Sequence, residues 1–265
     1  MEGRSSLFYA SLKGHLPVVE KLLEHGADIN KCDNEGRSSL HSASQNGHLP
    51  VVEKLIEHGA DINKCDNEGV SSLHFASQGG HLPVVEELIK HDADINYCDI
   101  EGQSSLHLAS QSGHLPVVEK LIEHGADINN CDNEGWSSLH MASHNGHLSV
   151  VEKLIEHGAD INHCDNDGRS SLFFASSNGH LSVVEKLIEH GADINKCDNG
   201  GWSSLHFASC DGNLPLVEKL LELGADINKC DNEGRSSLHW ASHNGHLPIV
   251  EKLIEHGADI NKCDN

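Results

Sequence analysis

The cysteines of this chain recur at a fixed interval, and that interval constrains the fold more than any other feature. Eight of the nine lie 33 residues apart, at Cys32, Cys65, Cys98, Cys131, Cys164, Cys197, Cys230 and Cys263. Such a period is typical of a repeat array, in which each repeat is one supersecondary unit that packs on its neighbours. The repeats are residues 1–32, 33–65, 66–98, 99–131, 132–164, 165–197, 198–230 and 231–263. We therefore expect a single array over residues 1–265.

The same spacing argues against disulfide and metal chemistry. Helices of neighbouring repeats pack about 8–10 Å apart, whereas a disulfide needs Cα atoms within roughly 7 Å of each other. No Cys-x-x-Cys pair of the kind that binds zinc occurs in the sequence. We expect no metal ion or cofactor, and we expect the thiols to be small buried hydrophobic groups in a reducing compartment. This predicts an intracellular, cytoplasmic location.

The charge of the chain narrows the class of partner. A formal net charge of −23 disfavours DNA, RNA and anionic membranes, because phosphate binding depends on concentrated Lys and Arg. No apolar run approaches the roughly 20 residues that cross a bilayer. The 23 histidines would cancel the net charge if all were protonated. This suggests the hypothesis that association or solubility changes between about pH 7 and pH 5.

Each repeat carries the local signals of two short helices. In the second repeat, residues 33–36 predict a turn, and Ser38 is placed to cap a first helix with His41 as its capping-box partner. Pro50 fits the first turn of a second helix, and Gly59 fits its C-terminal cap. Apolar residues at helical spacing predict the buried sides, with Leu40 and Ala43 in the first helix and Val51, Val52, Leu55 and Ile56 in the second.

These signals occur in an order that resembles the ankyrin repeat. Residues 38–41 (Ser-Ser-Leu-His), 47–48 (Gly-His) and 59–63 (Gly-Ala-Asp-Ile-Asn) match that family's Thr-Pro-Leu-His opening, its inter-helix Gly-His and its Gly-Ala-Asp-x-Asn exit. The resemblance covers essentially the whole chain. It implies an all-α solenoid of stacked helix–turn–helix units with β-turn or hairpin loops between repeats, which grips a protein or peptide on its concave face. Ser replaces the family's Pro in every copy, as at Ser39, which removes a preset backbone angle.

Function is expected where the copies differ, because a residue present in all eight serves the fold. One such place is the residue after the turn glycine, which we call the hairpin position: Arg4, Arg37, Val70, Gln103, Trp136, Arg169, Trp202 and Arg235. Another, on the first helix, we call the helix row: Tyr9, Ser42, Phe75, Leu108, Met141, Phe174, Phe207 and Trp240. The others are the places of Gln45 and Asn46 on the same helix face and the residue before the recurring cysteine, as at Tyr97.

Aromatic residues are concentrated at these places, which favours a binding surface. Eight of the ten aromatic side chains lie there, and only Phe8 and Phe173 do not. Trp and Tyr dominate interface hot spots. The candidate partner-binding residues are Arg4, Tyr9, Arg37, Ser42, Gln45, Val70, Phe75, Gln78, Tyr97, Gln103, Leu108, Gln111, Trp136, Met141, His144, Arg169, Phe174, Trp202, Phe207, Cys210, Asp211, Arg235, Trp240 and His243.

Packing is the alternative explanation of the helix row, since residues between neighbouring first helices also tolerate a change of size. That alternative explains Trp136 and Trp202 less well, because both follow a polar turn.

Catalysis is not expected. An enzyme needs a set of unlike residues assembled at one place, whereas Ser, His and Asp recur here in register. A reactive thiol at Cys210, beside Asp211, is disfavoured because no cation stands near it in the sequence.

Two further alternatives stay open at this point. The terminal repeats keep the apolar interior pattern, as at Leu253 and Ile254. The array is therefore expected to stack end to end with another copy, or to be an excised or engineered segment. It could equally be the targeting part of a larger enzyme or membrane protein. Leu55 followed by Asp61-Ile62-Asn63 resembles the motif of the asparaginyl hydroxylase that modifies ankyrin repeats. A loop-bonding role for Asn63 is the competing explanation.

Overall fold

The computed structural model describes residues 3–265 and divides into two compact units, Met1–Asn133 and Glu134–Asn265. The first unit contains helices α1 (Ser6–Leu12), α2 (Leu16–Glu24), α3 (Ser39–Gln45), α4 (Leu49–Glu57), α5 (Ser72–Gln78), α6 (Leu82–Lys90), α7 (Ser105–Gln111) and α8 (Leu115–Glu123). The second contains α9 (Ser138–His144), α10 (Leu148–Glu156), α11 (Ser171–Ser177), α12 (Leu181–Glu189), α13 (Ser204–Cys210), α14 (Leu214–Glu222), α15 (Ser237–His243) and α16 (Leu247–Glu255). The predicted all-α class of paired helices is confirmed.

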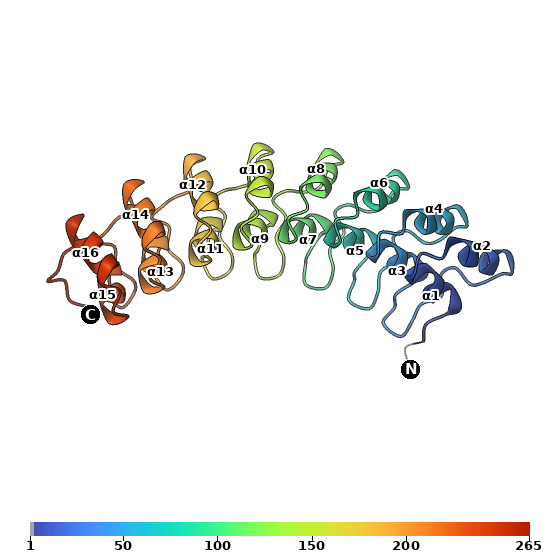
Figure 1. The fold of residues 1–265 in the computed structure, drawn as a ribbon, viewed down its shortest axis with the longest axis horizontal. Coiled ribbons are helices and arrows are strands. Elements are labelled where there is room, and N and C mark those ends of the chain that lie inside the picture. Colours follow the sequence, from blue (N-terminus) through green and yellow to red (C-terminus); the bar gives the residue numbers. More distant parts are fainter. Residues whose placement is uncertain (1–2) are drawn as a thin grey trace. The chain divides into compact units, whose positions relative to one another are not determined.

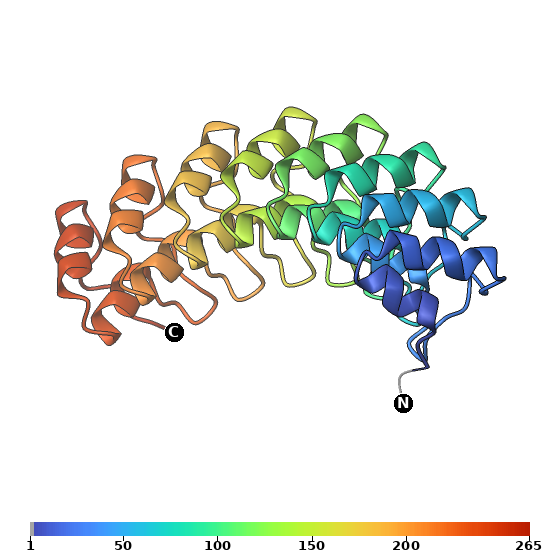
Figure 2. The ribbon, with the colours of Figure 1, turned by 45° about the vertical axis from the view of Figure 1, so that its right-hand side comes forward.

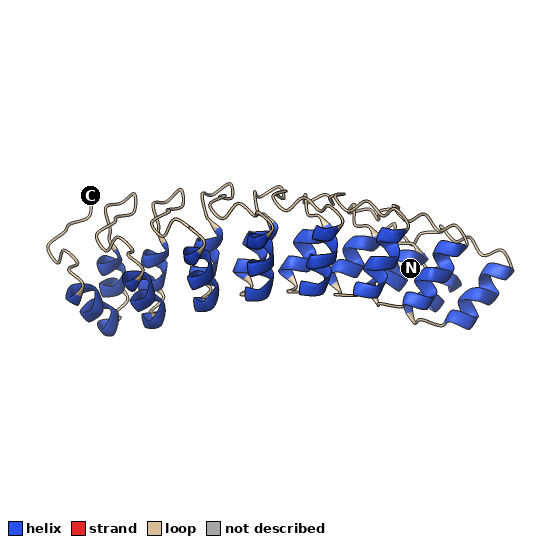
Figure 3. Cartoon of the chain, turned by 90° about the horizontal axis from the view of Figure 1, so that it is seen from above, coloured by secondary structure: helices blue, strands red, loops and turns tan. Residues whose placement is uncertain are grey.

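Within each unit the helices form two layers. The short first helices pack on one another, as do the longer second helices, and the two helices of a repeat pack together (Figure 1, Figure 2). The loops that join successive repeats all project from the same side of the helices within a unit (Figure 3). Because every helix is short, it buries its apolar side only against the repeats next to it.

The helix boundaries follow the local sequence signals. Ser38 caps α3, since its hydroxyl accepts the His41 N–H, while His41 Nδ1 accepts the backbone N–H of Ser38 at 3.0 Å. Pro50 lies in the first turn of α4, and Gly59, at φ +85°, ends that helix. The predicted apolar residues are buried, except that Ile56 is half-buried. Phe8 and Phe173 replace the histidine of the capping box in their repeats, so those helices retain only the Ser cap.

One repeat is fixed to the next by the histidine of the inter-helix turn. His81 Nε2 lies 3.0 Å from the Gln45 carbonyl oxygen of the preceding repeat, and its ring covers Gly47. A Cβ on Gly47 would come within 2.6 Å of the ring, and the φ of that glycine is +70°. Glycine is therefore required there for two reasons, a left-handed backbone and a close approach.

The loops form a second set of inter-repeat bonds. Asn67 donates its backbone N–H to the Glu35 carbonyl (2.9 Å), so successive hairpins are joined directly. Asn63 accepts the Asp94 N–H (2.8 Å) and donates to the Asp92 carbonyl (3.1 Å). This supports the loop-bonding role of Asn63; its hydroxylation stays a prediction.

The expected burial of the recurring cysteines is wrong in degree. Seven of the eight recurring cysteines are half-buried, and Cys263 is exposed. Cys65 illustrates why, since its Sγ lies 3.5 Å from the Asn63 carbonyl at the edge of the loop rather than between helices. Burial raises the pKa of the Cys65 thiol all the same. All nine cysteines are free thiols.

The capping-box histidines predict how stability depends on pH. Burial, and then the nearby His163, lower the pKa of His140 from 6.5 to about 4. Since the unfolded chain takes up a proton below about pH 6.5 and the folded chain does not, this histidine contributes stability that is present above pH 6.5 and is lost as the pH falls toward 4, up to roughly 3 kcal/mol. Burial also lowers the pKa of His41, His74 and His206.

We expect the His140→Phe variant to fold, because Phe8 and Phe173 occupy the same position in their repeats. Its free energy of unfolding in urea should fall less between pH 7 and pH 5 than that of the unmodified chain. Equal losses in the two proteins would contradict the assignment of His140 as a group that is kept neutral by the fold.

Candidate functional site

Each inter-repeat hairpin is organised by an aspartate. In the second repeat Asp33 Oδ1 accepts the backbone N–H groups of Glu35 (2.9 Å) and Arg37 (3.0 Å), and Gly36 takes φ +82°. This arrangement is an Asx turn, in which a short carboxylate replaces a backbone acceptor. It holds the hairpin position, where the repeats differ, directly beside a carboxylate.

An arginine at the hairpin position pairs with that carboxylate. Arg37 Nη2 lies 2.9 Å from Asp33 Oδ2 and 2.7 Å from Glu35 Oε2. The same pairing closes two hairpins of the second unit, with Arg169 on Asp165 (2.7 Å) and Asp167 (2.9 Å), and Arg235 on Asp231 (3.1 Å) and Glu233 (2.7 Å). Arginines placed in this way are already engaged within the fold.

These pairs set the charge of the hairpin aspartates. Burial of Asp33 opposes its ionisation, but hydrogen bonds from the Arg37 side chain and from the turn N–H groups outweigh it, so the pKa lies below its ordinary value. Asp231 shows the same balance, with burial opposed by hydrogen bonds from Arg235, and its pKa is also lowered. Both carboxylates are therefore charged at neutral pH.

The candidate residues differ widely in accessibility. Those with exposed side chains are Tyr9, Gln45, Gln78, Tyr97, Gln111, Asp211 and His243. Those that are half-buried are Arg4, Arg37, Val70, Phe75, Gln103, Trp136, His144, Arg169, Trp202, Phe207, Cys210, Arg235 and Trp240. Those that are buried are Ser42, Leu108, Met141 and Phe174.

Ser42 and Phe174, two buried members of the helix row, act as packing residues. Ser42 is 3% exposed and Phe174 is 4% exposed, so a partner cannot contact them without displacing their neighbours. Tyr9, in contrast, is 50% exposed. The packing alternative therefore accounts for the buried part of the helix row. Only the accessible members of the row can contact a partner.

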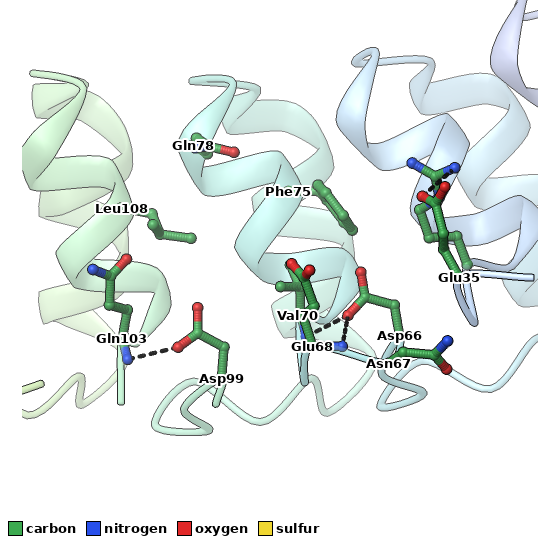
Figure 4. A pocket seen from close by; sticks show the side chains of 11 residues that line it. Glu35, Asp66, Asn67, Glu68, Val70, Phe75, Gln78, Asp99, Gln103 and Leu108 are labelled. Atoms are coloured by element: carbon green, nitrogen blue, oxygen red, sulfur yellow. Dashed lines mark hydrogen bonds and ion pairs between the residues drawn. The ribbon is translucent and has the colours of Figure 1, made fainter. Parts of the chain in front are cut away.

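In the first unit six candidate residues line one hollow of about 500 Å³ (Figure 4). They are Arg37, Val70, Phe75, Gln78, Gln103 and Leu108, from three successive repeats. Val70 and Phe75 supply its apolar surface together with Leu108, of which 7% is exposed. The positions at which these repeats differ thus meet in one place.

The acidic side of this hollow is not among the residues predicted from the sequence. Its rim carries Glu35, Asp66, Glu68 and Asp99, with Asn67 between them. The four carboxylates occupy positions that are acidic in nearly every copy, and residues that recur in this way were expected to serve the fold. The net charge of −23 was the available signal, because it requires carboxylates to accumulate on some surface.

In the second unit the aromatic residues form a run of ring contacts. Ring centroids are 4.1 Å apart for Trp136 and Phe174, 4.5 Å for Phe173 and Phe207, 4.6 Å for Trp202 and Phe207, and 4.4 Å for Trp202 and Trp240. Such separations are typical of stabilising aromatic pairs. The packing alternative therefore explains Trp136 and Trp202 better than their place after a polar turn indicates, since each packs on a phenylalanine of the helix row.

Trp240 is the most constrained member of this run. Its Nε1 donates to Asp231 Oδ2 (3.2 Å), and the Arg235 guanidinium lies over its ring with Cζ 4.2 Å from the centroid. A half-buried tryptophan with a fixed orientation loses little entropy on binding and so is suited to be an interface anchor.

The surroundings of Cys210 raise the pKa of its thiol and so disfavour a reactive thiolate. Its pKa is raised by burial and then by the charge of Asp211, and its Sγ accepts a hydrogen bond from Asn244 Nδ2 (3.3 Å). A nucleophilic cysteine requires the opposite shift. Cys210 therefore lies at the accessible end of α13 as a weakly polar surface residue.

The family model for ankyrin repeats, built on three copies, matches residues 2–66, 61–132, 106–198 and 191–264. The chain belongs to the ankyrin repeat family. Its structure is similar to the ankyrin repeat domain of human ASB11, with a TM-score of 0.77 and 28% sequence identity over 84% of this chain and 99% of that one. A comparison with curated protein sequences gives no match.

Ankyrin repeats are generally protein–protein interaction modules and are typically non-enzymatic. Within residues 3–265, no helix of this ankyrin array is long and apolar enough to span a lipid bilayer. Nor do three or more His, Cys, Asp or Glu side chains converge there as metal ligands.

A matched pair of substitutions separates the packing and surface members of the helix row. Phe174→Ala should lower the free energy of unfolding by about 3–5 kcal/mol, because it leaves a cavity among buried rings. Tyr9→Ala should change it by no more than about 1 kcal/mol, because Tyr9 is half exposed to solvent. Urea denaturation of the two variants measures both changes in the free energy of unfolding. Decreases of similar size would contradict the assignment of Phe174 as an interior residue.

Proposed function

We propose that the chain is a protein-interaction scaffold whose partner, a protein or a peptide, contacts the surface formed by the hairpins and the first helices. One observation carries this proposal: six residues chosen only because the repeats differ there line the same hollow in the first unit. Positions that served packing alone would not need to share an accessible hollow. The exposed Gln78 and the half-buried Phe75 and Val70 offer mixed polar and apolar contacts.

The second unit supports the proposal through its tryptophans. Trp202 and Trp240 are half-buried and are held by ring contacts with each other and with Phe207. Their remaining accessible surface lies on the first helices and hairpins, as the hollow of the first unit does. Large aromatic side chains in fixed positions contribute most to binding at interfaces.

The chemistry of the chain supports binding rather than catalysis. We propose that it acts without a cofactor and binds neither nucleic acid nor a membrane, since its net charge is −23. The free cysteines suit a reducing, intracellular compartment. A single array over residues 1–265 and end-to-end self-association both stay predictions, as does a role as the targeting part of a larger protein.

The tryptophans provide the test of this function. A partner captured with the intact chain should bind Trp202→Ala and Trp240→Ala each about 30-fold more weakly, equivalent to about 2 kcal/mol. Circular dichroism at the binding temperature should show both variants to be folded.

Phe174→Ala is the matched control, because it disturbs the interior of the same unit and leaves the ring contacts of Trp202 with Phe207 and Trp240 in place. It should lose stability and retain affinity. Unchanged affinity in both tryptophan variants, together with a lower melting temperature, would identify Trp202 and Trp240 as packing residues and contradict the proposal for this unit.

A further inference from the structure

The hairpins of the second unit contain a recurrent guanidinium site. In the sixth repeat, Arg169 contacts the carboxylates of Asp165 and Asp167 and stands over the ring of Phe174, with Cζ 5.1 Å from its centroid. In the eighth repeat Arg235 makes the equivalent contacts with Asp231, Glu233 and Trp240. The site thus consists of two carboxylates, two residues apart, and one aromatic face.

The third repeat has the same three components without the arginine. Asp66, Glu68 and Phe75 occupy the corresponding positions, while the hairpin position is Val70. Asp66 Oδ1 accepts the turn N–H groups of Glu68 (2.9 Å) and Val70 (2.9 Å), so the hairpin is formed as in the arginine-containing repeats. The hairpin frame is therefore present in this repeat, with Val70 where the other two repeats carry arginine.

The aromatic face is also in the same place. The ring of Phe75 meets His41 of the preceding repeat at 5.8 Å and 88°, and the ring of Phe174 meets His140 at 5.7 Å and 86°. These two pairs are equivalent in the repeat. Phe75 accordingly presents its ring as Phe174 does, where the Phe174 ring supports Arg169.

Asp66 is more exposed than its counterparts. Asp165 and Asp231 are each 6% exposed and therefore buried, whereas Asp66 is half-buried. Among the described residues no Lys or Arg pairs with Asp66 or Glu68. Both carboxylates and Phe75 line the hollow of the first unit (Figure 4).

We propose that Asp66, Glu68 and Phe75 form an arginine-binding site for a partner peptide, in which an arginine of the partner takes the place that Arg169 and Arg235 fill in their own repeats. This inference rests on the proposed function and names the chemistry of the partner segment. Arginine fits better than lysine, because its planar fork reaches two acceptors at once and stacks on an aromatic face.

The surroundings of the site favour the same ligand. The hollow is lined by the carboxylates of Glu35, Asp66, Glu68 and Asp99 and by one cation, Arg37, which is already paired with Asp33 and Glu35. The apolar side chains of Val70 and Leu108 lie beside them. A segment with arginine between apolar residues therefore matches both the charge and the apolar wall of the hollow.

The chain offers a sensitive probe of this site because it contains only five phenylalanines. Full-length protein labelled with 4-fluorophenylalanine gives five ¹⁹F resonances, and Phe75→Leu assigns the one that belongs to Phe75. The peptide acetyl-Gly-Leu-Arg-Leu-Gly-amide should shift the Phe75 resonance saturably, at concentrations on the order of millimolar. The same peptide with citrulline in place of arginine has the same shape without the charge. It should need a concentration at least about tenfold higher to shift the Phe75 resonance equally.

Two substitutions at one position supply the decisive variants. Val70→Arg should fill the site from within, as in the sixth and eighth repeats, and abolish the peptide-induced shift while the protein stays folded. Val70→Gln copies the residue at the same position of the fourth repeat, Gln103, and should retain the shift.

The inference is overturned if the arginine peptide leaves the Phe75 resonance unmoved, if citrulline performs as well as arginine, or if Val70→Arg binds the peptide as the unmodified chain does. Because the titration uses no partner protein, any of these results removes the arginine site alone. The scaffold function has a separate readout in the loss of partner affinity on substitution of the tryptophans.

Discussion

The contact between one repeat and the next is the interaction on which the rest of the structure depends. No helix of seven or nine residues is stable alone in water, so each must bury its apolar side against a neighbour. The turn histidine fixes the distance and orientation of that neighbour: His81 bonds to the Gln45 carbonyl and covers Gly47. The hairpin bond from Asn67 to Glu35 fixes the loops in the same register.

In this construction the polar and titratable side chains that recur in the sequence have structural roles. His41 is a capping group, Asn63 joins two loops, and Asp33 organises a hairpin. Since these side chains are committed to the fold in copy after copy, binding chemistry has to come from the positions between them. The hairpin position shows this most simply: arginine there forms an ion pair with the hairpin carboxylate, and valine forms only a backbone hydrogen bond with it.

The fold was predictable because capping and turn residues act locally in the sequence. The site was less so, because it depends on contacts between side chains of different repeats. Ser38, Pro50 and Gly59 act within one helix turn, so sequence spacing alone located both helices. The burial of Phe174 arises from contacts with Trp136 and Arg169, and nothing in the composition of its helix distinguishes it from the accessible Tyr9. The rim carboxylates, such as Glu68, were missed because one residue type can serve the turn and face the hollow at once.

The central claim is that the partner contacts hairpins and first helices, where the repeats differ, and leaves the second helices free. Hydrogen–deuterium exchange of the chain with and without its captured partner tests this most directly. The account predicts new protection in the hairpins and first helices, including residues 66–78 and 99–111, and unchanged exchange in α4, α6 and α8. Protection confined to the second helices would contradict it.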